Sequence, residues 1–237
     1  MPHLTIPKEN VIGLAYEPPV FLQLNQAFID YVKAHVSNYY IGKTTTSLPN
    51  EFIEKYSYLN YNSNIPISPK TKVMSIIFSQ KRATTGQRYR NELIKRILET
   101  NLPIHIYGIG CKTLPTHSQG QLKWRSSLMI DPRIKGAFKG TEPYDGYMFH
   151  ITIENVSIPE YFSEKITQAL VSKCVPIYWG CTRIDNYFPG LTHKLVGNVD
   201  RDMKTITSIC NNPKKYYEQI NIDVETIKKT CNIENVL

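Results

Sequence analysis

The 237-residue sequence lacks the patterns that mark several large classes of protein. Its five cysteines are an odd number and form no C-x-x-C pair, so neither a disulfide framework nor a zinc knuckle is supported. No apolar run approaches the ~20 residues of a membrane span. The N-terminal stretch MPHLTIPKEN also has no apolar signal core. We therefore expect reduced cysteines, a cytoplasmic location and no membrane span.

Several catalytic motifs are absent as well. The sequence has no G-x-x-x-x-G-K-[ST], which disfavours a nucleoside triphosphatase, and neither G-x-S-x-G nor G-x-G-x-x-G. The histidines are scattered without an H-x-x-x-H pattern. Asp200-Arg201-Asp202 is a D-x-D, which in some glycosyltransferases binds a divalent metal. So short a string arises often by chance, and we predict no metal site.

The charge balance favours an anionic partner. The formal net charge is +8 and the pI is about 9.1, which suits a nucleotide, a nucleic acid or a membrane surface. The basic residues are dispersed, apart from one cluster of Lys81-Arg82, Arg88 and Arg90. Dispersed charge is more typical of a solvated face than of a nucleic-acid track, so no nucleic-acid partner is expected.

Hydrophobic periodicity predicts an alternation of strands and helices. The expected strands are residues 10–15, 38–42, 72–79, 104–108, 149–153, 175–179 and 195–199. The expected helices are residues 21–36, 88–100, 160–173, 202–211 and 216–230, with a helical turn near 51–56 and a long loop with one short helix over 111–145. The stretch NYNSNIPISPK, residues 60–70, reads as a linker. We expect an N-terminal lobe, residues 1–66, and a doubly wound α/β domain, residues 67–237.

The most informative run is FHITIENVSIPEYFSEKITQALVSKCVPIYWG, residues 149–180. Its polar residues in the loop and at the helix start are Glu154, Asn155, Tyr161, Glu164 and Lys165. This is where an α/β protein holds an anionic ligand such as a nucleotide. A lysine at a helix N-terminus opposes the macrodipole unless it reaches an anion there. The plain alternatives are a solvated helix end for Glu164-Lys165 and a polar turn for Glu154-Asn155.

A second candidate is the basic loop KRATTGQRYR, which follows a predicted strand and leads into a helix. This layout is typical of a phosphate site. The alternative is an ordinary solvated loop.

The run 149–180 resembles the signature of glycosyltransferase family 10, the α-1,3/1,4-fucosyltransferases. The resemblance is carried by I-x-I-E-N, by the spacing from Asn155 to Tyr161, by Y-F-S-E-K-I and by V-P-I-Y-W-G. SIIFSQ with Arg90-Asn91, YGIGC, and the stretch from GLAYEPP to YYIG are similar to further parts of the family. The combination is also similar to proteins of large DNA viruses that encode their own glycosylation enzymes.

The resemblance implies a GT-B-like arrangement: a Rossmann-type C-terminal donor domain and a short α/β N-terminal lobe. It also implies GDP-fucose as donor, inversion at the anomeric carbon and no metal or other cofactor. Arg90 and Lys165 would bind the donor diphosphate, Glu164 the ribose, and Tyr161 would lie beside the nucleotide. Glu154 and Asn155 would face the sugar and phosphate.

Three departures from the family pattern bear on activity. The N-terminal lobe is shorter than is usual in the family. An inverting transfer needs a general base, yet Lys43-Thr44-Thr45-Thr46 stands where bacterial members carry an acidic residue. Either Glu17 or Glu51 substitutes, or the base is missing. We take Glu17 and Glu154 as the candidate catalytic carboxylates. Gln80 and Val156 replace an Asn and a Ser of the family pattern, which bears on the identity of the donor.

The sequence thus predicts an inverting, fucosyltransferase-type glycosyltransferase. It would move a sugar from a nucleotide-sugar donor, with GDP-fucose favoured, to a glycan acceptor in the cytoplasm, or in the host cytoplasm if the chain is viral. Two alternatives stay open. One is the same fold with a different nucleotide sugar, and the other is a catalytically silent nucleotide-sugar or glycan-binding module of a larger protein.

Overall fold

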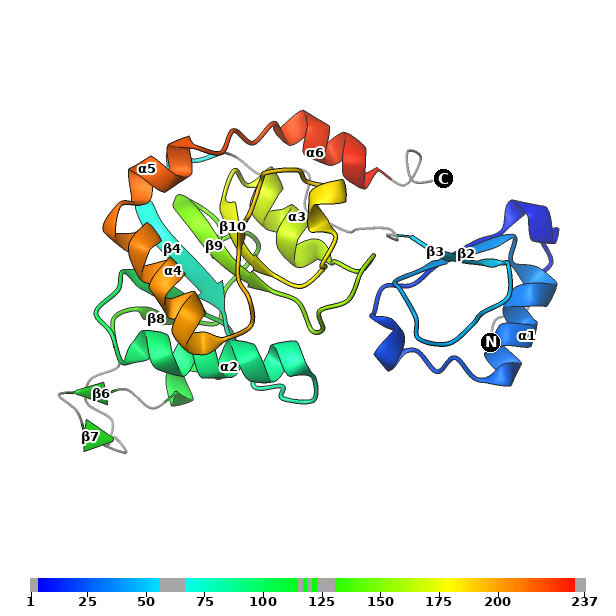
Figure 1. Cartoon of the computed structure of the whole chain (residues 1–237), viewed down its shortest axis with the longest axis horizontal. Coiled ribbons are helices and arrows are strands. Elements are labelled where there is room, and N and C mark those ends of the chain that lie inside the picture. The colour runs from blue at the N-terminus through cyan, green and yellow to red at the C-terminus, as the bar shows by residue number, and fades with distance from the viewer. Residues whose placement is uncertain (1–3, 56–66, 115–116, 119–120, 123–130, 233–237) are drawn as a thin grey trace.

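The computed structural model describes residues 4–55, 67–114, 117–118, 121–122 and 131–232. Two parallel sheets organise these residues (Figure 1). The smaller has the strand order β1-β2-β3, and the larger has the order β11-β10-β9-β4-β5-β8. The α/β class is therefore confirmed. Most of the predicted linker lies outside the described residues, and the division between residues 66 and 67 stays a prediction.

The smaller sheet lies in the N-terminal lobe. Its elements are β1 (Ile12–Leu14), α1 (Gln26–His35), β2 (Asn38–Ile41) and β3 (Phe52–Glu54), with 3₁₀ turns at Lys8–Asn10 and Pro19–Phe21. The side chain of Asn25 caps α1 by accepting a hydrogen bond from the backbone N–H of Phe28 at 2.9 Å. The helix therefore begins later than the predicted residue 21.

Two predictions for this lobe are wrong. The segment expected to form a helical turn near residues 51–56 is instead strand β3, which pairs with β2 and buries Phe52. Strand β1 is not buried as expected, because it lies at an edge of the sheet and exposes Ile12.

The larger sheet and its helices occupy the rest of the described chain. The strands are β4 (Lys72–Ile77), β5 (Ile104–Tyr107), β8 (Ile134–Gly136), β9 (Tyr147–Ile153), β10 (Val175–Trp179) and β11 (His193–Lys194). The helices are α2 (Thr85–Leu98), α3 (Glu164–Val171), α4 (Val199–Asn211), α5 (Pro213–Glu218) and α6 (Val224–Cys231). Short 3₁₀ turns lie at Cys111–Thr113 and Ile184–Asn186, and β6 (His117–Ser118) pairs with β7 (Gln121–Leu122).

Four boundaries in this part differ from the prediction. Strand β8 lies inside the expected loop 111–145 and pairs with β5. Strand β11 precedes the expected strand 195–199. The expected helix 216–230 is divided, because Asp223 caps a new helix, α6. Helix α3 begins at Glu164, because the side chain of Ser163 caps it.

The core of this part consists of one large hydrophobic cluster and a smaller one that includes Tyr107, Tyr144 and Tyr147. The face of α2 predicted from its periodicity is buried: Tyr89, Leu93, Ile94, Ile97 and Leu98. Helix α2 packs beside α4, and α3 packs beside α6 (Figure 1). All five cysteines are free and buried: Cys111, Cys174, Cys181, Cys210 and Cys231. Among the described residues, no helix combines the length and apolarity needed to cross a bilayer.

Candidate functional site

The strand order of the larger sheet reverses between β4 and β9. From β4 the chain moves outward through β5 and β8, and it then returns to place β9 on the other side of β4. Open parallel sheets bind ligands outside the carboxyl ends of their strands at such a switch point. A cavity of about 310 Å³ lies against these strands, and its walls include Ile77, Arg90, Tyr144, Ile153, Glu164 and Lys165. This volume lies at the lower end of the range for small-molecule sites.

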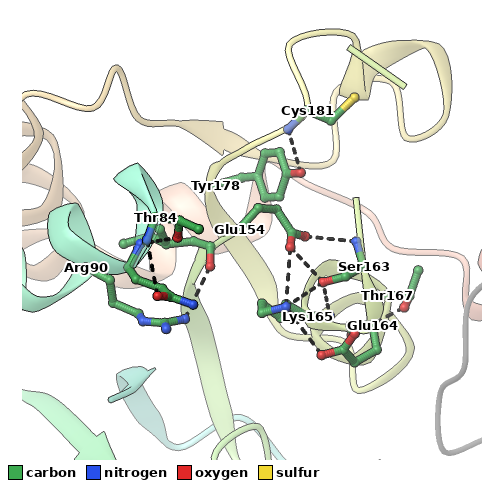
Figure 2. Close-up of polar contacts among 11 residues, drawn as sticks. Thr84, Arg90, Glu154, Ser163, Glu164, Lys165, Thr167, Tyr178 and Cys181 are labelled. Atoms are coloured by element: carbon green, nitrogen blue, oxygen red, sulfur yellow. Dashed lines mark hydrogen bonds and ion pairs between the residues drawn. The ribbon is translucent and has the colours of Figure 1, made fainter. Parts of the chain in front are cut away.

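Glu154, directly after β9, fixes the start of α3. Its side chain is fully buried, and its carboxylate accepts hydrogen bonds from the N–H of Ser163 at 3.0 Å and from the Ser163 hydroxyl at 2.6 Å (Figure 2). Lys165 Nζ lies 3.5 Å from the same carboxylate and donates to Ser163 Oγ at 2.8 Å. Ser163 Oγ therefore donates to Glu154 and accepts from Lys165, which places the lysine at the cavity wall.

Lys165 lies at the start of α3, as the sequence predicted, and nearby carboxylates keep it charged there. It is the second residue of α3, where the macrodipole disfavours a cation. Burial alone would lower the pKa of Lys165, but the charges of Glu154 and Glu164 outweigh burial and the pKa is raised. Lys165 is therefore protonated throughout the physiological range.

Arg90 supplies a second cation from α2. Its side chain is buried, with 7% exposed, and NH1 donates to the carbonyl of Ile153 at 3.4 Å. Burial lowers the pKa of Arg90 while Glu154 opposes that shift. An arginine side chain nevertheless stays charged in a protein. Within the described residues, Arg90 Nε is buried and has no hydrogen-bond partner. A buried donor without a partner in a native protein calls for an explanation, and a bound anion provides one.

The charges around the cavity are arranged for an anion. Arg90 and Lys165 face one fully buried carboxylate, Glu154, whose oxygens already accept bonds from Ser163. The carboxylate of Glu164 lies at the rim, where 59% of the side chain is exposed. Glu164 also pairs with Lys165, at 3.4 Å, but solvent screens this exposed carboxylate. Two cations then face one buried carboxylate, and an anion between them would be held by charge-assisted hydrogen bonds.

Two glycines allow these elements to approach one another. A Cβ on Gly86 would lie 1.9 Å from the carbonyl oxygen of Glu154, and one on Gly180 would lie 2.4 Å from Glu154 Cγ. The N–H of Gly86 also donates to the carbonyl of Asn155 at 3.0 Å. The glycine in the basic loop KRATTGQRYR thus brings α2, and with it Arg90, against the end of β9.

Asn155 and Tyr161 do not line the cavity. Asn155 contributes the carbonyl just described, and Tyr161 is buried, which raises the pKa of its phenol. The segment that carries them contacts the N-terminal lobe: Pro159 accepts a hydrogen bond from the N–H of Lys43 at 3.2 Å. A Cβ on Gly42 would lie 2.9 Å from Tyr161 Cβ. These two predicted donor contacts are therefore not brought together with the cations.

The carboxylates of the N-terminal lobe differ in whether they are already paired with a lysine. Glu17 is exposed, and its charge is among those that help burial to raise the pKa of Tyr161. Glu51 forms an ion pair with Lys8 at 2.9 Å. Glu54, which the sequence did not single out, forms an ion pair with Lys43 and accepts from the Thr44 N–H at 2.9 Å. It was missed because its segment was predicted to be a helical turn.

The D-x-D string has a structural explanation. Asp202 is buried and accepts hydrogen bonds from the Tyr89 hydroxyl at 2.6 Å and from the Val196 N–H at 2.9 Å. Asp200 is exposed and lies 3.9 Å from Arg96. Within the described chain, His, Cys, Asp and Glu side chains form no group of three or more that could hold a metal ion.

Besides Glu54, two residues at or beside the cavity were missed by sequence reasoning. Ser163 could have been found, because a serine directly before Glu164-Lys165 is a helix N-cap signal. His150, a buried side chain at the cavity wall, carried no local signal.

Comparison with known proteins places the chain beside one family. The family model for the C-terminal part of glycosyltransferase family 10 (fucosyltransferase) matches residues 67–194, more than half of the chain. A fucosyltransferase-like protein of Arabidopsis thaliana is 24% identical over 81% of this chain and 34% of its own length. A protein of Acanthamoeba polyphaga mimivirus named as a fucosyltransferase is 28% identical over 40% of this chain and 18% of its own length. The chain thus spans about a third or less of these relatives.

Among solved structures, TarM matches 95% of this chain and 48% of its own length, with a TM-score of 0.55 and 10% identity. This match supports the two-lobed α/β fold of the GT-B type. An α1,3-fucosyltransferase crystallised with GDP matches 63% of this chain and 38% of its own length, with a TM-score of 0.43 and 20% identity.

Proposed function

Because the chain belongs to glycosyltransferase family 10, the fucosyltransferase family, we propose that it is an inverting glycosyltransferase. It would move a sugar from a nucleotide-sugar donor, with GDP-fucose favoured, to a hydroxyl group of a glycan. The observation that carries this proposal is the pair of cations, Arg90 and Lys165, at a cavity of about 310 Å³ at the switch point of the parallel sheet.

The two cations would act on the leaving group. In the transfer, an acceptor oxygen attacks the anomeric carbon, and the bond from that carbon to the phosphate oxygen breaks. Negative charge then grows on the departing nucleoside diphosphate, where Arg90 and Lys165 would stabilise it. Glu164, at the cavity rim, is suitably placed to accept a hydrogen bond from the ribose. We expect no metal requirement, so activity should survive EDTA.

Glu154 supports this site indirectly. Its carboxylate is fully buried and holds Ser163 and Lys165, so it does not reach the reacting atoms. We therefore assign it a positioning role in place of the predicted catalytic one. Asn155 would act through its backbone contact with Gly86, and Tyr161 through its packing beneath the N-terminal lobe.

The general base would come from the N-terminal lobe. Glu17 is the candidate, because it is exposed and its charge acts on Tyr161 in the C-terminal lobe, residues 67–237, which we call the donor lobe. Glu51 and Glu54 are engaged by Lys8 and Lys43. In the transfer, Glu17 would take the proton of the acceptor hydroxyl as the new glycosidic bond forms. The cytoplasmic location expected from the cysteines stays a prediction.

One observation favours a catalytically silent binding module instead. Directly after β2 the chain carries Lys43 and Thr44, and both are bound to Glu54 rather than open to an acceptor. Such a module would bind GDP or a GDP-sugar without hydrolysing or transferring it. The same fold with a different donor would show a preference for another nucleotide.

The test is a thermal-shift screen with GDP, UDP and their sugars, followed by donor hydrolysis and transfer assays. A ligand that binds only the native state raises stability by RT ln(1 + [L]/Kd). Lys165→Ala should weaken GDP binding by about 1.5–3 kcal/mol, the scale of a charged hydrogen bond. Lys204→Ala, an exposed lysine of α4, is the matched control. If no nucleotide shifts the melting temperature, the proposal fails; if GDP binds without turnover, the binding module is supported.

A further inference from the structure

His150 is a buried residue of the cavity wall that the proposed chemistry does not use. It lies on β9, 2% exposed, and lines the same cavity as Arg90 and Lys165. The Tyr144 ring packs on its imidazole with centroids 4.5 Å apart and planes at 48°. The ring is therefore held in one place by its neighbours.

The hydrogen bonds around His150 define its tautomer. Its Nδ1 lies 2.8 Å from Ser75 Oγ. The Ser75 hydroxyl has one hydrogen, and it donates that hydrogen to the carbonyl of Pro143. Ser75 Oγ must therefore accept from His150, so the hydrogen of the neutral imidazole is on Nδ1.

Nε2 is then the ring nitrogen available to a ligand. In the neutral ring with hydrogen on Nδ1, Nε2 carries only a lone pair and can only accept a hydrogen bond. Within the described chain the ring's hydrogen-bond partners are Ser75 Oγ, at Nδ1, and the Pro143 carbonyl. That carbonyl is bound to Ser75 Oγ and so lies on the Nδ1 side of the ring. Burial lowers the pKa of His150 to about 3; the hydrogen bond to the Pro143 carbonyl opposes this shift and Arg90 adds to it, so the ring stays neutral at physiological pH.

We infer that His150 Nε2 accepts a hydrogen bond from an N–H or O–H group of the nucleoside part of the donor, which makes His150 a specificity-determining residue. This inference rests on the proposed function and names the part of the donor that occupies the cavity. The diphosphate lies at Arg90 and Lys165 in that proposal. The sugar must remain reachable by an acceptor, so the enclosed part of the cavity is left for the nucleoside.

The walls around His150 suit a nucleoside. Phe138, Tyr144 and Ile77 offer apolar and aromatic surface on which a planar base can pack. A buried acceptor in such a wall selects ligands that carry a matching donor, because a ligand without one leaves the acceptor unpaired. Guanine offers N–H groups and ribose offers hydroxyls, and both sources share this chemistry.

The experiment compares two ligands on two proteins by calorimetry. GDP and inorganic pyrophosphate are titrated into the wild-type chain and into His150→Phe, which keeps a ring and removes the acceptor. We expect His150→Phe to lower the affinity for GDP about 10-fold, the scale of a buried neutral hydrogen bond. The affinity for pyrophosphate should not change. Equal GDP affinity in both proteins would overturn the inference alone. Failure of the wild type to bind GDP would overturn the proposed function as well.

Analogues identify the group that donates. 2′-Deoxy- and 3′-deoxy-GDP remove ribose donors, whereas inosine diphosphate and 1-methyl-GDP remove base donors. One analogue should bind the wild type about 10-fold more weakly than GDP does. The same analogue should bind His150→Phe as tightly as GDP binds that variant. If each of the four analogues lost the same affinity relative to GDP in both proteins, the inference would be contradicted.

A second measurement does not depend on the folding of the variant. In the native protein labelled with ¹⁵N-histidine, the unprotonated Nε2 resonance of His150 should shift upfield when GDP is added and stay in place when pyrophosphate is added. If the chemical shift of the Nε2 resonance did not change at a saturating concentration of GDP, the inference would be overturned.

Discussion

The donor lobe and the N-terminal lobe place their functional groups in opposite environments. In the donor lobe, Arg90 and Glu154 are buried, and Ser163 joins the end of β9 to the start of α3. In the N-terminal lobe, Glu17 is exposed beside a small core made of Ala15, Val32, Val36, Ile41 and Phe52. Most of the exposed large apolar side chains of the described chain lie there too: Ile6, Ile12, Tyr16, Val20 and Phe21.

Under the proposed function, this difference separates donor binding from proton transfer. The donor lobe holds its cations in place before a ligand arrives, so binding should need little rearrangement. The smaller lobe would supply the proton acceptor from its surface, where its position depends on how the two lobes meet. Each of the following changes tests one side of this contrast.

The largest expected effect is on transfer through the smaller lobe. Glu17→Gln should lower the transfer rate by about 10²- to 10⁴-fold, because it removes the general base. GDP affinity should not change, since Glu17 lies outside the donor cavity. Glu9→Gln, at another exposed position of the same lobe, is the control. Transfer at the wild-type rate by Glu17→Gln would remove this residue from the mechanism.

Matched core truncations compare the stability of the lobes. Ile106, on β5, and Ile41, on β2, are both fully buried. We expect Ile106→Ala to cost about 4 kcal/mol and Ile41→Ala about 2 kcal/mol, because a small core collapses more easily around a cavity. Urea unfolding gives the free energies, and hydrogen exchange shows which lobe opens. Equal costs, with exchange changed in both lobes together, would indicate one cooperative unit.

Acid should act first on the donor lobe through His150. Its pKa falls from about 6.5 when unfolded to about 3 when folded, so its neutral form stabilises the fold fully above pH 6.5. Stability is lost as the pH falls from 6.5 toward 3, and the loss reached at pH 4.5 is about 3 kcal/mol. The groups that face the ring are Arg90, Ser75, Tyr144 and the Pro143 carbonyl.

The measurement is the free energy of unfolding at pH 7 and pH 4.5 for the wild type and for His150→Phe. The variant should lose less stability than the wild type over this interval. The carboxylates that titrate in the same range are common to both proteins. An identical loss in the two proteins would show that His150 does not carry this pH dependence.

The smallest effect concerns the contact between the lobes. Gly42→Val places atoms against Tyr161 and the carbonyl of Glu160, and we expect a loss of about 1–2 kcal/mol. Transfer should fall while GDP affinity is retained, because the cations are held within the donor lobe. Thr45→Val, at an exposed position nearby, is the control. A variant that lost GDP affinity would show that the lobes share the donor site.

Sequence patterns predicted the long elements of the donor lobe and missed short ones. The apolar strands near residues 72–79 and 149–153 and the apolar face of α2 carry strong periodic signals, and the structure confirms them. The three-residue strands Phe52–Glu54 and Ile134–Gly136 carry too few residues for a period. Their conformation follows from pairing with β2 and β5, which local sequence does not encode.

At the candidate site, too, sequence predicted what local patterns carry and missed what depends on distant segments. Glu164, Lys165 and Arg90 were chosen from a helix start and a family resemblance, and all three line one cavity. The burial of Glu154 could not be foreseen, because it depends on Gly180 and Ser163 approaching from other segments. The tautomer of His150 depends on Ser75, which is 75 residues away in the chain.

The buried cysteines make the chain a convenient frame for spectroscopic labelling. Burial raises the pKa of the thiols, to about 12 for Cys174, Cys210 and Cys231, so thiolate for a maleimide to attack is scarce at neutral pH. A cysteine introduced at Thr45 and another at Lys204, both exposed, would therefore carry spin labels or fluorophores without first removing the native thiols. The distance between the two labels, followed during a GDP titration, would report directly how the lobes move.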